Sequence, residues 1–256
     1  MDIATPVGIG VGMAVIVAAN VMEGGNPASL LNVPAMMLVF GTTILISMAG
    51  GTMADFKHSI GALKTAFTGG VQPAGAVVPQ VVSLAEKARR EGLLALEDMV
   101  RDMEDPFLVK GVTMAVDGTD PDEVRDILEA EVAAMRKADK QAAKFFADAG
   151  AYAPTIGIIG TVMGLVHVLE NLAQPEELGH LIAAAFIATL WGVMSANVIW
   201  LPIASRLKRL SELEAARMDL IIEGIAAIQA GSNPRVIAQK LTSLLPAEQQ
   251  PTAEAA

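Results

Sequence analysis

Four long stretches of the chain contain no Asp, Glu, Lys or Arg and consist mostly of apolar residues. They are residues 3–22, 24–54, 149–169 and 178–205. A helix of about 20 mostly apolar residues crosses a hydrocarbon core of roughly 30 Å, and backbone in lipid must pair its polar groups internally. The pattern therefore predicts four membrane-spanning helices.

The second stretch is longer than the helix it predicts, and the first could also be a signal peptide. Residues 24–27 (Gly-Gly-Asn-Pro) favour a turn, so the second helix is expected to start near Leu30 and to end near Gly51. The first stretch lacks the basic residues that precede the apolar core of a signal peptide, and its apolar run is longer than that core. We therefore expect it to be retained as a helix.

Basic residues are confined to two blocks of the chain. All 18 Lys and Arg residues lie either within 57–144 or within 206–240. The two connecting loops, 23–32 and 170–177, carry Glu residues and no basic residue. By the positive-inside rule, both basic blocks and both chain termini are predicted to lie in the cytoplasm.

The first basic block shows helical periodicity. Its apolar residues recur at helical spacing at Val124, Ile127, Leu128, Val132 and Met135. Residues 120–123 (Asp-Pro-Asp-Glu) are typical of a helix start, and we expect this helix to continue into the third span as one stalk. Upstream, residues 79–90 and 93–103 are expected to be helical with a break at Gly92, and residues 104–106 to form a turn.

The second basic block predicts a helix over 206–231 and a last helix that is capped by residues 232–234 and ends at Leu245. Residues 246–256 have a composition typical of disorder. The predicted fold class is an all-α polytopic membrane protein with four transmembrane helices and a helical cytoplasmic domain. Its parts are spans one and two (1–54), a cytoplasmic helical domain (55–148), spans three and four (149–205) and C-terminal helices with a tail (206–256).

Composition narrows the function. Apolar residues make up 53% of the chain and charged residues only 18%, which argues against an ordinary soluble domain. The absence of Cys excludes a disulfide scaffold, and a net charge of −10 argues against a nucleic-acid partner. The three His residues form no metal-binding motif, and there is no nucleotide-binding or nucleophile motif. We expect no catalytic residue, no metal site and no cofactor. We expect the chain to be surrounded by membrane lipid.

The four spans contain no Asp or Glu, although ion translocation commonly relies on an ionisable group inside the membrane. If the chain works with an ion gradient, a second polypeptide must supply that carboxylate. Polar walls for such a path are predicted at Thr161, Thr189, Ser195 and Asn197. The alternative for each hydroxyl, a bond to the backbone one turn earlier, is the more common role. Glycines 8, 10, 12, 160 and 164 are expected to serve close helix packing.

Several motifs resemble the MotA/PomA family of flagellar motor stator subunits. Residues 87–97 (Lys-Ala-Arg-Arg-Glu-Gly-Leu-Leu-Ala-Leu-Glu) are similar to the family's charged cytoplasmic motif. Residues 153–165 (Ala-Pro-Thr-Ile-Gly-Ile-Ile-Gly-Thr-Val-Met-Gly-Leu) are similar to its third-span signature. Residues 188–192, together with Asn197 and Pro202, and the tail residues 233–241 also match. The resemblance thus covers nearly the whole chain.

The resemblance implies a complex in which five such chains surround a dimer of a MotB-like single-span partner that carries the ion-accepting Asp. Ion passage would turn the pentamer, which would push on the rotor protein FliG through Arg89, Arg90 and Glu97. Arg90 and Glu97 would share one face if the helix ran through Gly92. Without the resemblance, a solvated charged face is the simpler interpretation of these three residues.

The resemblance also implies that Pro154 and Pro202 couple ion passage to motion, against the alternative that they are ordinary helix-end prolines. Protons are favoured slightly as the transported ion, and sodium stays open because threonines serve either ion. A second candidate is an energiser of the ExbB/TolQ kind, but that group has one span before its large cytoplasmic portion, whereas here two spans precede it. A self-contained transporter or enzyme lacks both an intramembrane charge and a catalytic constellation.

Overall fold

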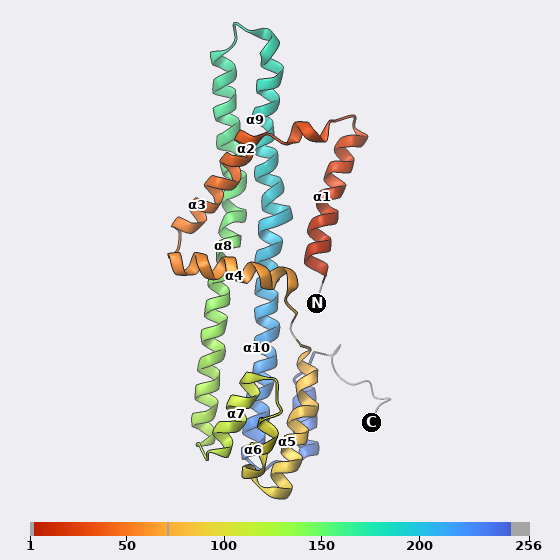
Figure 1. Ribbon diagram of the computed structural model, residues 1–256, viewed down its shortest axis with the longest axis vertical. Helices are drawn as coiled ribbons and strands as arrows, with labels where there is room; N and C mark the ends of the chain where they lie inside the picture. The colour runs from red at the N-terminus through yellow and green to blue at the C-terminus, as the bar shows by residue number, and fades with distance from the viewer. Residues whose placement is uncertain (1–2, 71, 247–256) are drawn as a thin grey trace. The chain divides into compact units, whose positions relative to one another are not determined.

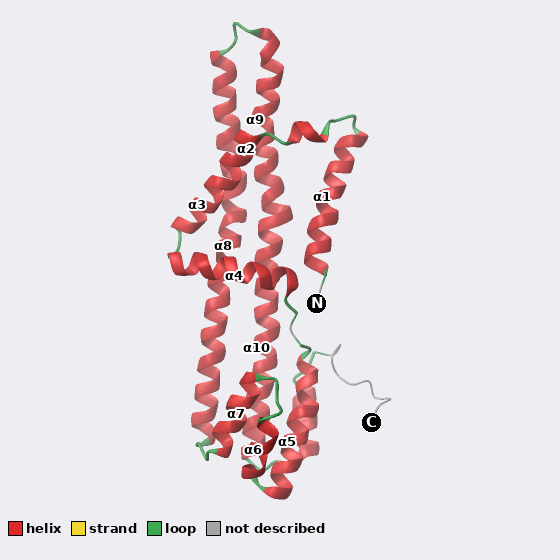
Figure 2. Ribbon diagram, viewed as in Figure 1, coloured by secondary structure: helices red, strands yellow, loops and turns green. Residues whose placement is uncertain are grey.

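The computed structural model describes residues 3–70 and 72–246, and in this part of the chain every regular element is helical (Figures 1 and 2). The chain divides into two compact units. The first comprises Met1–Gly70 and Asp139–Arg209, and the second Val71–Ala138 and Leu210–Ala256. The all-α fold is confirmed. The predicted disordered tail falls, from residue 247 on, outside the described residues.

The first unit contains most of the apolar helices. Its elements are α1 (Ala4–Met22), η1 (Pro27–Leu30), α2 (Val33–Met36), η2 (Met37–Gly41), α3 (Thr42–Ala49), α4 (Met53–Thr68), the second part of α8 (Pro121–Glu170), α9 (Pro175–Ser195), η5 (Ala196–Trp200) and the start of α10 (Leu201–Gln229). Both η2 and η5 are π-helical turns inside longer helical runs. Such turns have a wider backbone ring than the α-helix and frequently occur at functional sites.

Three helices are long and apolar enough to cross a membrane. They are α1, the C-terminal part of α8, and the helical run Pro175–Gln229. The segment predicted as the second span forms a shorter apolar helix, Val33–Ala49. None of the residues of α1 is buried, and many apolar side chains of α8 and α9 are exposed. These side chains need an apolar surrounding, which agrees with a membrane protein.

Side-chain caps fix where several of these elements begin. The Asn32 side chain accepts a hydrogen bond from the Ala35 backbone N–H, 3.1 Å away, at the start of α2. At the start of α4, Thr52 and Asp55 form a reciprocal capping box. Both arrangements satisfy backbone N–H groups that a helix start leaves unpaired. The chain therefore has defined points at which it enters and leaves the apolar segment 33–49.

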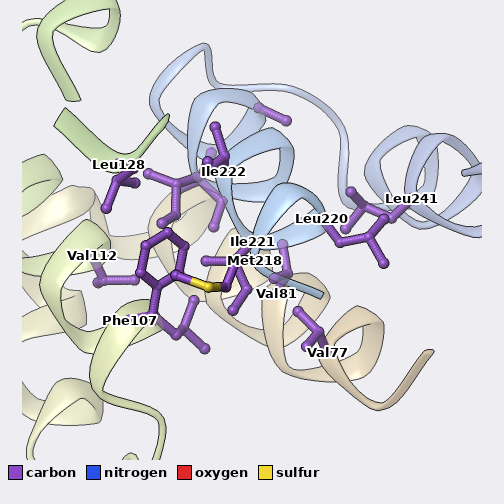
Figure 3. Packing of buried hydrophobic residues seen from close by; sticks show 14 of the residues in the cluster. Val77, Val81, Phe107, Val112, Leu128, Met218, Leu220, Ile221, Ile222 and Leu241 are labelled. Carbon is purple, nitrogen blue, oxygen red and sulfur yellow. The ribbon is translucent and has the colours of Figure 1, made fainter. Parts of the chain in front are cut away.

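The second unit is a helical domain with a core of its own. It contains η3 (Ala74–Ala76), α5 (Val77–Glu91), η4 (Leu93–Leu96), α6 (Glu97–Val100), α7 (Pro106–Val116), the first part of α8, the rest of α10, and α11 (Pro234–Ser243). Figure 3 shows Val81 of α5, Phe107 of α7, Leu128 of α8 and Ile221 of α10 packed together. Each is 5% exposed or less. Burial of these side chains supplies the main stabilisation of this unit.

Most of the predicted boundaries are confirmed. α8 is a single helix that starts at Pro121, α5 ends at Glu91 before Gly92, and Asn233 caps α11. Residues 104–105 lie outside helices as expected, but Asp105 also caps α7, a helix that the sequence analysis did not separate. An Asp-Pro pair is typical both of turns and of helix starts, and here it starts a helix.

Candidate functional site

In the first unit, α8 and α9 contact each other closely at two glycines. A Cβ atom added at Gly157 would lie 2.8 Å from the carbonyl oxygen of Ala188. One added at Gly192 would lie 2.6 Å from the carbonyl oxygen of Ala153. Because these neighbours are backbone atoms, a larger residue at either position would force the helices apart. The two helix backbones therefore meet at the level of Gly157 and Gly192.

The same contact extends along α8 to two further glycines. Added Cβ atoms at Gly160 and Gly164 would lie 2.7 and 2.6 Å from the Cβ atoms of two alanines in α9. The packing role expected for Gly160 and Gly164 is confirmed. Gly8 and Gly10 differ, since an added Cβ there meets nothing within 4 Å. Within the described chain, these two glycines serve no close helix packing.

Thr161 of α8 and Thr189 of α9 face each other across this contact. Their Oγ1 atoms are 2.5 Å apart, and Thr161 Oγ1 donates to the Ala185 carbonyl at 2.9 Å. Both hydroxyls also lie 3.3 Å from the carbonyl oxygen of Gly157. Both residues are half-buried. The structure thus brings two of the four predicted polar residues into one hydrogen-bonded pair.

The hydroxyl pair has more acceptor capacity than the chain itself uses. A hydroxyl has one proton to donate and two lone pairs to accept with. Thr161 and Thr189 direct their protons to each other or to backbone carbonyls, so oxygen lone pairs remain for a water, a protonated carboxyl or a cation. The alternative of backbone bonding is present too, because Gly157 lies one turn before Thr161. Bonding to the backbone holds the pair in place without using all of its lone pairs.

Ser195 and Asn197 do not join this pair. Ser195 is 0% exposed, and its hydroxyl donates to the Gly192 carbonyl of its own helix at 3.3 Å. Asn197 is exposed, and its Nδ2 donates to the Val193 carbonyl at 2.8 Å. One side chain thus faces the interior of the unit and the other its surface. Each makes the local backbone bond that is common for polar residues in apolar helices.

Pro154 lies in the interior of α8, so the helix-end interpretation is wrong for this residue. A proline cannot donate the backbone hydrogen bond to the carbonyl four residues earlier. The missing bond lies just before the glycine contact, in which the carbonyl of Ala153 faces Gly192. The third span therefore has a weakened hydrogen-bond ladder about two turns before Thr161.

Pro202 follows a π-helical turn. It is the second residue of α10, directly after η5, and the helix continues through it as Pro175–Gln229. The ring of an internal proline clashes with the carbonyl of the preceding turn, and a π-turn is one of the known ways in which a helix absorbs a local disturbance. Both candidate coupling prolines thus sit at irregular points inside long helices.

In the second unit, Arg89 and Arg90 lie in the last turn of α5, and Glu97 is the first residue of α6. Gly92 has a φ of +86°, a conformation that disfavours other residues and ends the helix. The condition under which Arg90 and Glu97 would share one helix face is therefore not met. Each makes an exposed local ion pair of 3.7 Å, Arg90 with Glu86 and Glu97 with Arg101.

Less exposed ion pairs connect helices of the second unit to one another. Glu223 of α10 accepts hydrogen bonds from Arg125 of α8 at 2.8 Å and from Lys240 of α11 at 2.6 Å. These two bonds, that of Arg125 foremost, hold the pKa of the Glu223 carboxyl below its usual range. Glu223 therefore connects three helices of the second unit.

We expect the second unit to lose stability at acidic pH because the Glu223 carboxylate becomes protonated. A carboxyl whose pKa is lowered by folding stabilises the folded state above its unfolded pKa, and this contribution is lost as the pH falls through the folded pKa. Glu223→Gln should cost about 1.5 kcal/mol at neutral pH and almost nothing below the folded pKa. Thermal unfolding of the purified complex between neutral and acidic pH measures the difference. Glu91→Gln, at an exposed carboxylate, is the control, and equal losses for both variants would contradict the assignment.

Comparisons with known proteins agree with this geometry. Residues 99–220 match the MotA/TolQ/ExbB proton channel family. The solved structure of C. jejuni MotAB superimposes with a TM-score of 0.93 at 29% identity, over 97% of each chain. The flagellar MotAB stator complex from Bacillus subtilis gives 0.89 at 36% identity, over 96% of this chain and 97% of that one.

Curated relatives match over almost the full length. Motility protein A of Bacillus subtilis (strain 168) is 36% identical over 249 residues, which are 97% of this chain and 92% of the relative. Chemotaxis protein PomA of Vibrio alginolyticus is 34% identical over 245 residues, 96% of each. The chain belongs to the MotA/PomA family of flagellar motor stator subunits. The resemblance inferred from the motifs is thereby confirmed.

One feature of this MotA/PomA-family chain was missed by sequence reasoning. Trp191 of α9 donates its Nε1–H to the Leu30 carbonyl at 2.7 Å, which ties α9 to the last residue of η1. Its ring also contacts Phe40 in η2, with ring centroids 5.6 Å apart. A Trp inside an apolar span needs a hydrogen-bond partner, and this requirement was the available signal.

The ring contacts continue from Trp191 across the first unit as far as α4. Neighbouring ring centroids lie 5.2 to 6.4 Å apart along the order Trp191, Phe40, Trp200, Phe146, Phe145 and Phe56. We call this series the aromatic chain. It joins the turn η2 to the turn η5 and ends in α4. Both π-helical turns of the MotA/PomA-family chain therefore meet through aromatic rings.

Proposed function

We propose that the chain is the MotA-like subunit of a flagellar stator. Together with a MotB-like single-span partner, it forms an ion-conducting complex that converts ion-motive force into torque on the rotor. The observation that carries this function is the match along the whole chain to solved MotAB complexes. The Thr161–Thr189 pair supports it, because these hydroxyls occur in spans that have no carboxylate of their own.

We infer four spans with both termini in the cytoplasm. The helix Val33–Ala49 is near the lower end of the length that crosses a bilayer, about 17 residues. The positions of Lys and Arg support the orientation. The protein would then lie in the cytoplasmic membrane, which is the inner membrane where a cell has two. The same distribution supports a cytoplasmic domain over 55–148 and a cytoplasmic C-terminal part from residue 206.

The partner would supply the Asp that accepts the ion, and five copies of this chain would surround a dimer of that partner. Thr161 and Thr189 would face the carboxyl, with Ser195 and Asn197 further along the path, and Pro154 and Pro202 would let the spans move as ions pass. We propose H⁺ as the ion, for which the paired hydroxyls would accept hydrogen bonds from water or a protonated carboxyl, although their spare lone pairs would also coordinate Na⁺. The chain would need no cofactor or catalytic residue for this work.

FliG is the proposed target of the exposed charges. Arg89 and Arg90 carry like charge next to Gly92, and Glu97 opens the following helix. Exposed ion pairs contribute about 0 to 1 kcal/mol each, so Arg90 is released from Glu86 at little cost. Such contacts are weak and are screened by salt, and they therefore suit repeated engagement and release. This assignment does not need Arg90 and Glu97 to share a helix face.

Reversing the charge of Arg90 tests the rotor contact. We expect Arg90→Glu to weaken engagement about fivefold, the equivalent of about 1 kcal/mol, without affecting membrane insertion. Torque of single motors at fixed load measures the effect. The matched control is Arg235→Glu, which reverses an exposed charge on α11 of the same unit. Unchanged torque, even with Arg89 reversed as well, would exclude this contact.

A deletion strain tests the function as a whole. Swimming is scored beside electron micrographs of the flagella, and the wild-type copy is restored as the control. Intact but paralysed filaments that the restored copy rescues would establish a stator. Normal swimming with loss of an envelope transport activity would favour the ExbB/TolQ alternative. Co-purification of the chain would then identify the partner that it energises.

A further inference from the structure

A polar pocket of about 300 Å³ lies in the first unit where the end of α3 turns into α4 and both meet α8. Its polar side chains are Ser47, Thr52, Asp55, Gln141, Lys144 and Asp148. None of them belongs to the Thr161–Thr189 pair or to the exposed charges around Gly92. We refer to this site as the polar pocket. The functional assignments above leave it without a role.

The polar pocket contains both signs of charge. Lys144 donates a hydrogen bond to Asp148 one turn later in α8. Asp55 accepts two bonds from Thr52, from the backbone N–H at 2.9 Å and from the hydroxyl at 2.7 Å, and both reach Oδ2. A lysine has three N–H donors and a carboxylate about four acceptor sites. One cation and two anions therefore keep hydrogen-bonding capacity inside the same pocket.

Hydrogen bonds favour the charged forms of Asp55 and Lys144. The hydrogen bond from the Thr52 side chain foremost lowers the pKa of Asp55, and the hydrogen bond to Asp148 foremost raises the pKa of Lys144. With two carboxylates and one ammonium, the lining has a net negative charge but also a cationic side. An anion alone or a simple cation alone would use only part of it.

Ser47 gives independent evidence of a missing partner. It is 4% exposed, and its Oγ has no hydrogen-bond partner among the residues that the structure describes. Two hydroxyls of α4, those of Ser59 and Thr68, bond the carbonyl four residues earlier. A buried hydroxyl without a partner has lost its bonds to water and gained none, which destabilises the fold. A polar group that enters the pocket from outside the chain would remove this cost.

The surroundings of the pocket indicate what kind of molecule enters. Ser47 belongs to the apolar helix 33–49, whose Leu45 and Ile46 are 60% and 43% exposed, whereas α4 begins with charged residues. The pocket thus lies where apolar surface ends and polar surface begins. Molecules that are abundant at this boundary of a membrane protein are phospholipids, whose headgroups are polar and whose chains cover apolar surface.

We propose that the polar pocket binds the phosphoethanolamine headgroup of a membrane phospholipid. Asp55 and Asp148 would accept hydrogen bonds from the primary ammonium, and Lys144 would donate to the phosphate together with the Ser47 hydroxyl. The acyl chains would lie along Leu45 and Ile46. A primary ammonium has three N–H donors that match the two carboxylates, whereas a trimethylated ammonium has none. The site thus distinguishes phosphatidylethanolamine from phosphatidylcholine, and it does so whatever function the complex has.

Lipid exchange tests this site on the complete complex. The complex is reconstituted into nanodiscs of phosphatidylglycerol with an equal share of either phosphatidylethanolamine or phosphatidylcholine. Native mass spectrometry then measures how much of each lipid is retained after detergent extraction. We expect about tenfold preferential retention of phosphatidylethanolamine, the effect of one charge-assisted hydrogen bond. Equal retention of both lipids would overturn the proposal.

Variants separate the pocket from general lipid binding. Asp148→Asn should abolish the preference. Lys144→Gln, and Ser47→Ala with the packing of α3 kept, should instead lower the retention of both lipids, because the phosphate that these two residues contact is common to both. Lys140→Gln is the matched control, since Lys140 is an exposed lysine one turn earlier in α8 that does not line the pocket. A preference that survives Asp148→Asn, or a lipid retention that Lys144→Gln leaves unchanged, would contradict the site.

The free headgroup decides between two sources of the same chemistry. Soluble phosphoethanolamine is added to the delipidated complex in detergent, and the thermal unfolding temperature is compared with that in phosphatidylethanolamine. Greater stabilisation by the lipid, lost in Lys144→Gln, supports a lipid site. Equal stabilisation by the soluble headgroup would assign the pocket to a small solute and overturn the lipid as its ligand.

Discussion

Replacing Thr161 by Val is expected to lower ion flux and torque about tenfold while the amount of chain in the membrane stays unchanged. Val is close to Thr in shape but lacks the hydroxyl that bonds Thr189 and the Ala185 carbonyl. Losing one such interaction is worth about 1.4 kcal/mol, which corresponds to a factor of ten in rate. Single-motor torque and ion uptake into vesicles with the reconstituted complex measure the effect.

Two further variants show whether the hydroxyl itself matters. Thr161→Ser keeps the hydroxyl and should retain most of the torque. Thr155→Val removes an exposed hydroxyl of the same helix that donates to the Tyr152 carbonyl at 2.8 Å, and should leave torque unchanged. Normal torque of Thr161→Val under every ionic condition would remove this residue from the ion path.

Replacing Asp105 by Ala is expected to destabilise the second unit by about 3 kcal/mol. Asp105 caps α7 by accepting hydrogen bonds from Phe107 N at 3.0 Å and Leu108 N at 3.3 Å, and it also pairs with Arg217 of α10. The side chains of Asp105 and Arg217 are 15% and 11% exposed. Loss of a cap costs about 1 kcal/mol, and breaking a mostly buried ion pair adds more, because Arg217 loses one of its two carboxylate partners and keeps only Glu214.

Thermal unfolding of the purified complex and the level of chain in the membrane measure this loss. Asp120→Ala is the matched control, because Asp120 accepts a hydrogen bond from Asp122 N at 2.9 Å at the exposed start of α8. That variant should lose about 1 kcal/mol only. If the two variants lose equal stability, the pair of Asp105 with Arg217 contributes nothing.

The sequence predicted the helical segments well because their signals are local. The cap at Asp120, the break at Gly92 and the absence of charge over 149–169 each depend on a few neighbouring residues. The π-turns at 37–41 and 196–200 could not be predicted in this way. They depend on packing between spans that are distant in the sequence, such as Phe40 against Trp200.

The candidate site was predicted in part for the same reason. Thr161 and Thr189 were recognised as polar residues in apolar spans, but only the glycine contact shows that they meet, whereas Ser195 and Asn197 turn to their own helix. The expected shared face of Arg90 and Glu97 failed because a positive φ at Gly92 redirects the chain. Spacing along a helix predicts a common face only while the helix continues.

The aromatic chain gives the protein an optical reporter. Trp191 and Trp200 are the only two tryptophans in the sequence, and both contact Phe40. The indole of Trp191 is hydrogen-bonded, whereas Nε1 of Trp200 is buried without a partner among the described residues. Fluorescence excited in this chain's tryptophans therefore originates beside Phe40 of η2, from Trp191 in α9 and Trp200 in η5, and a change in its wavelength would report a rearrangement of these helices without any attached dye.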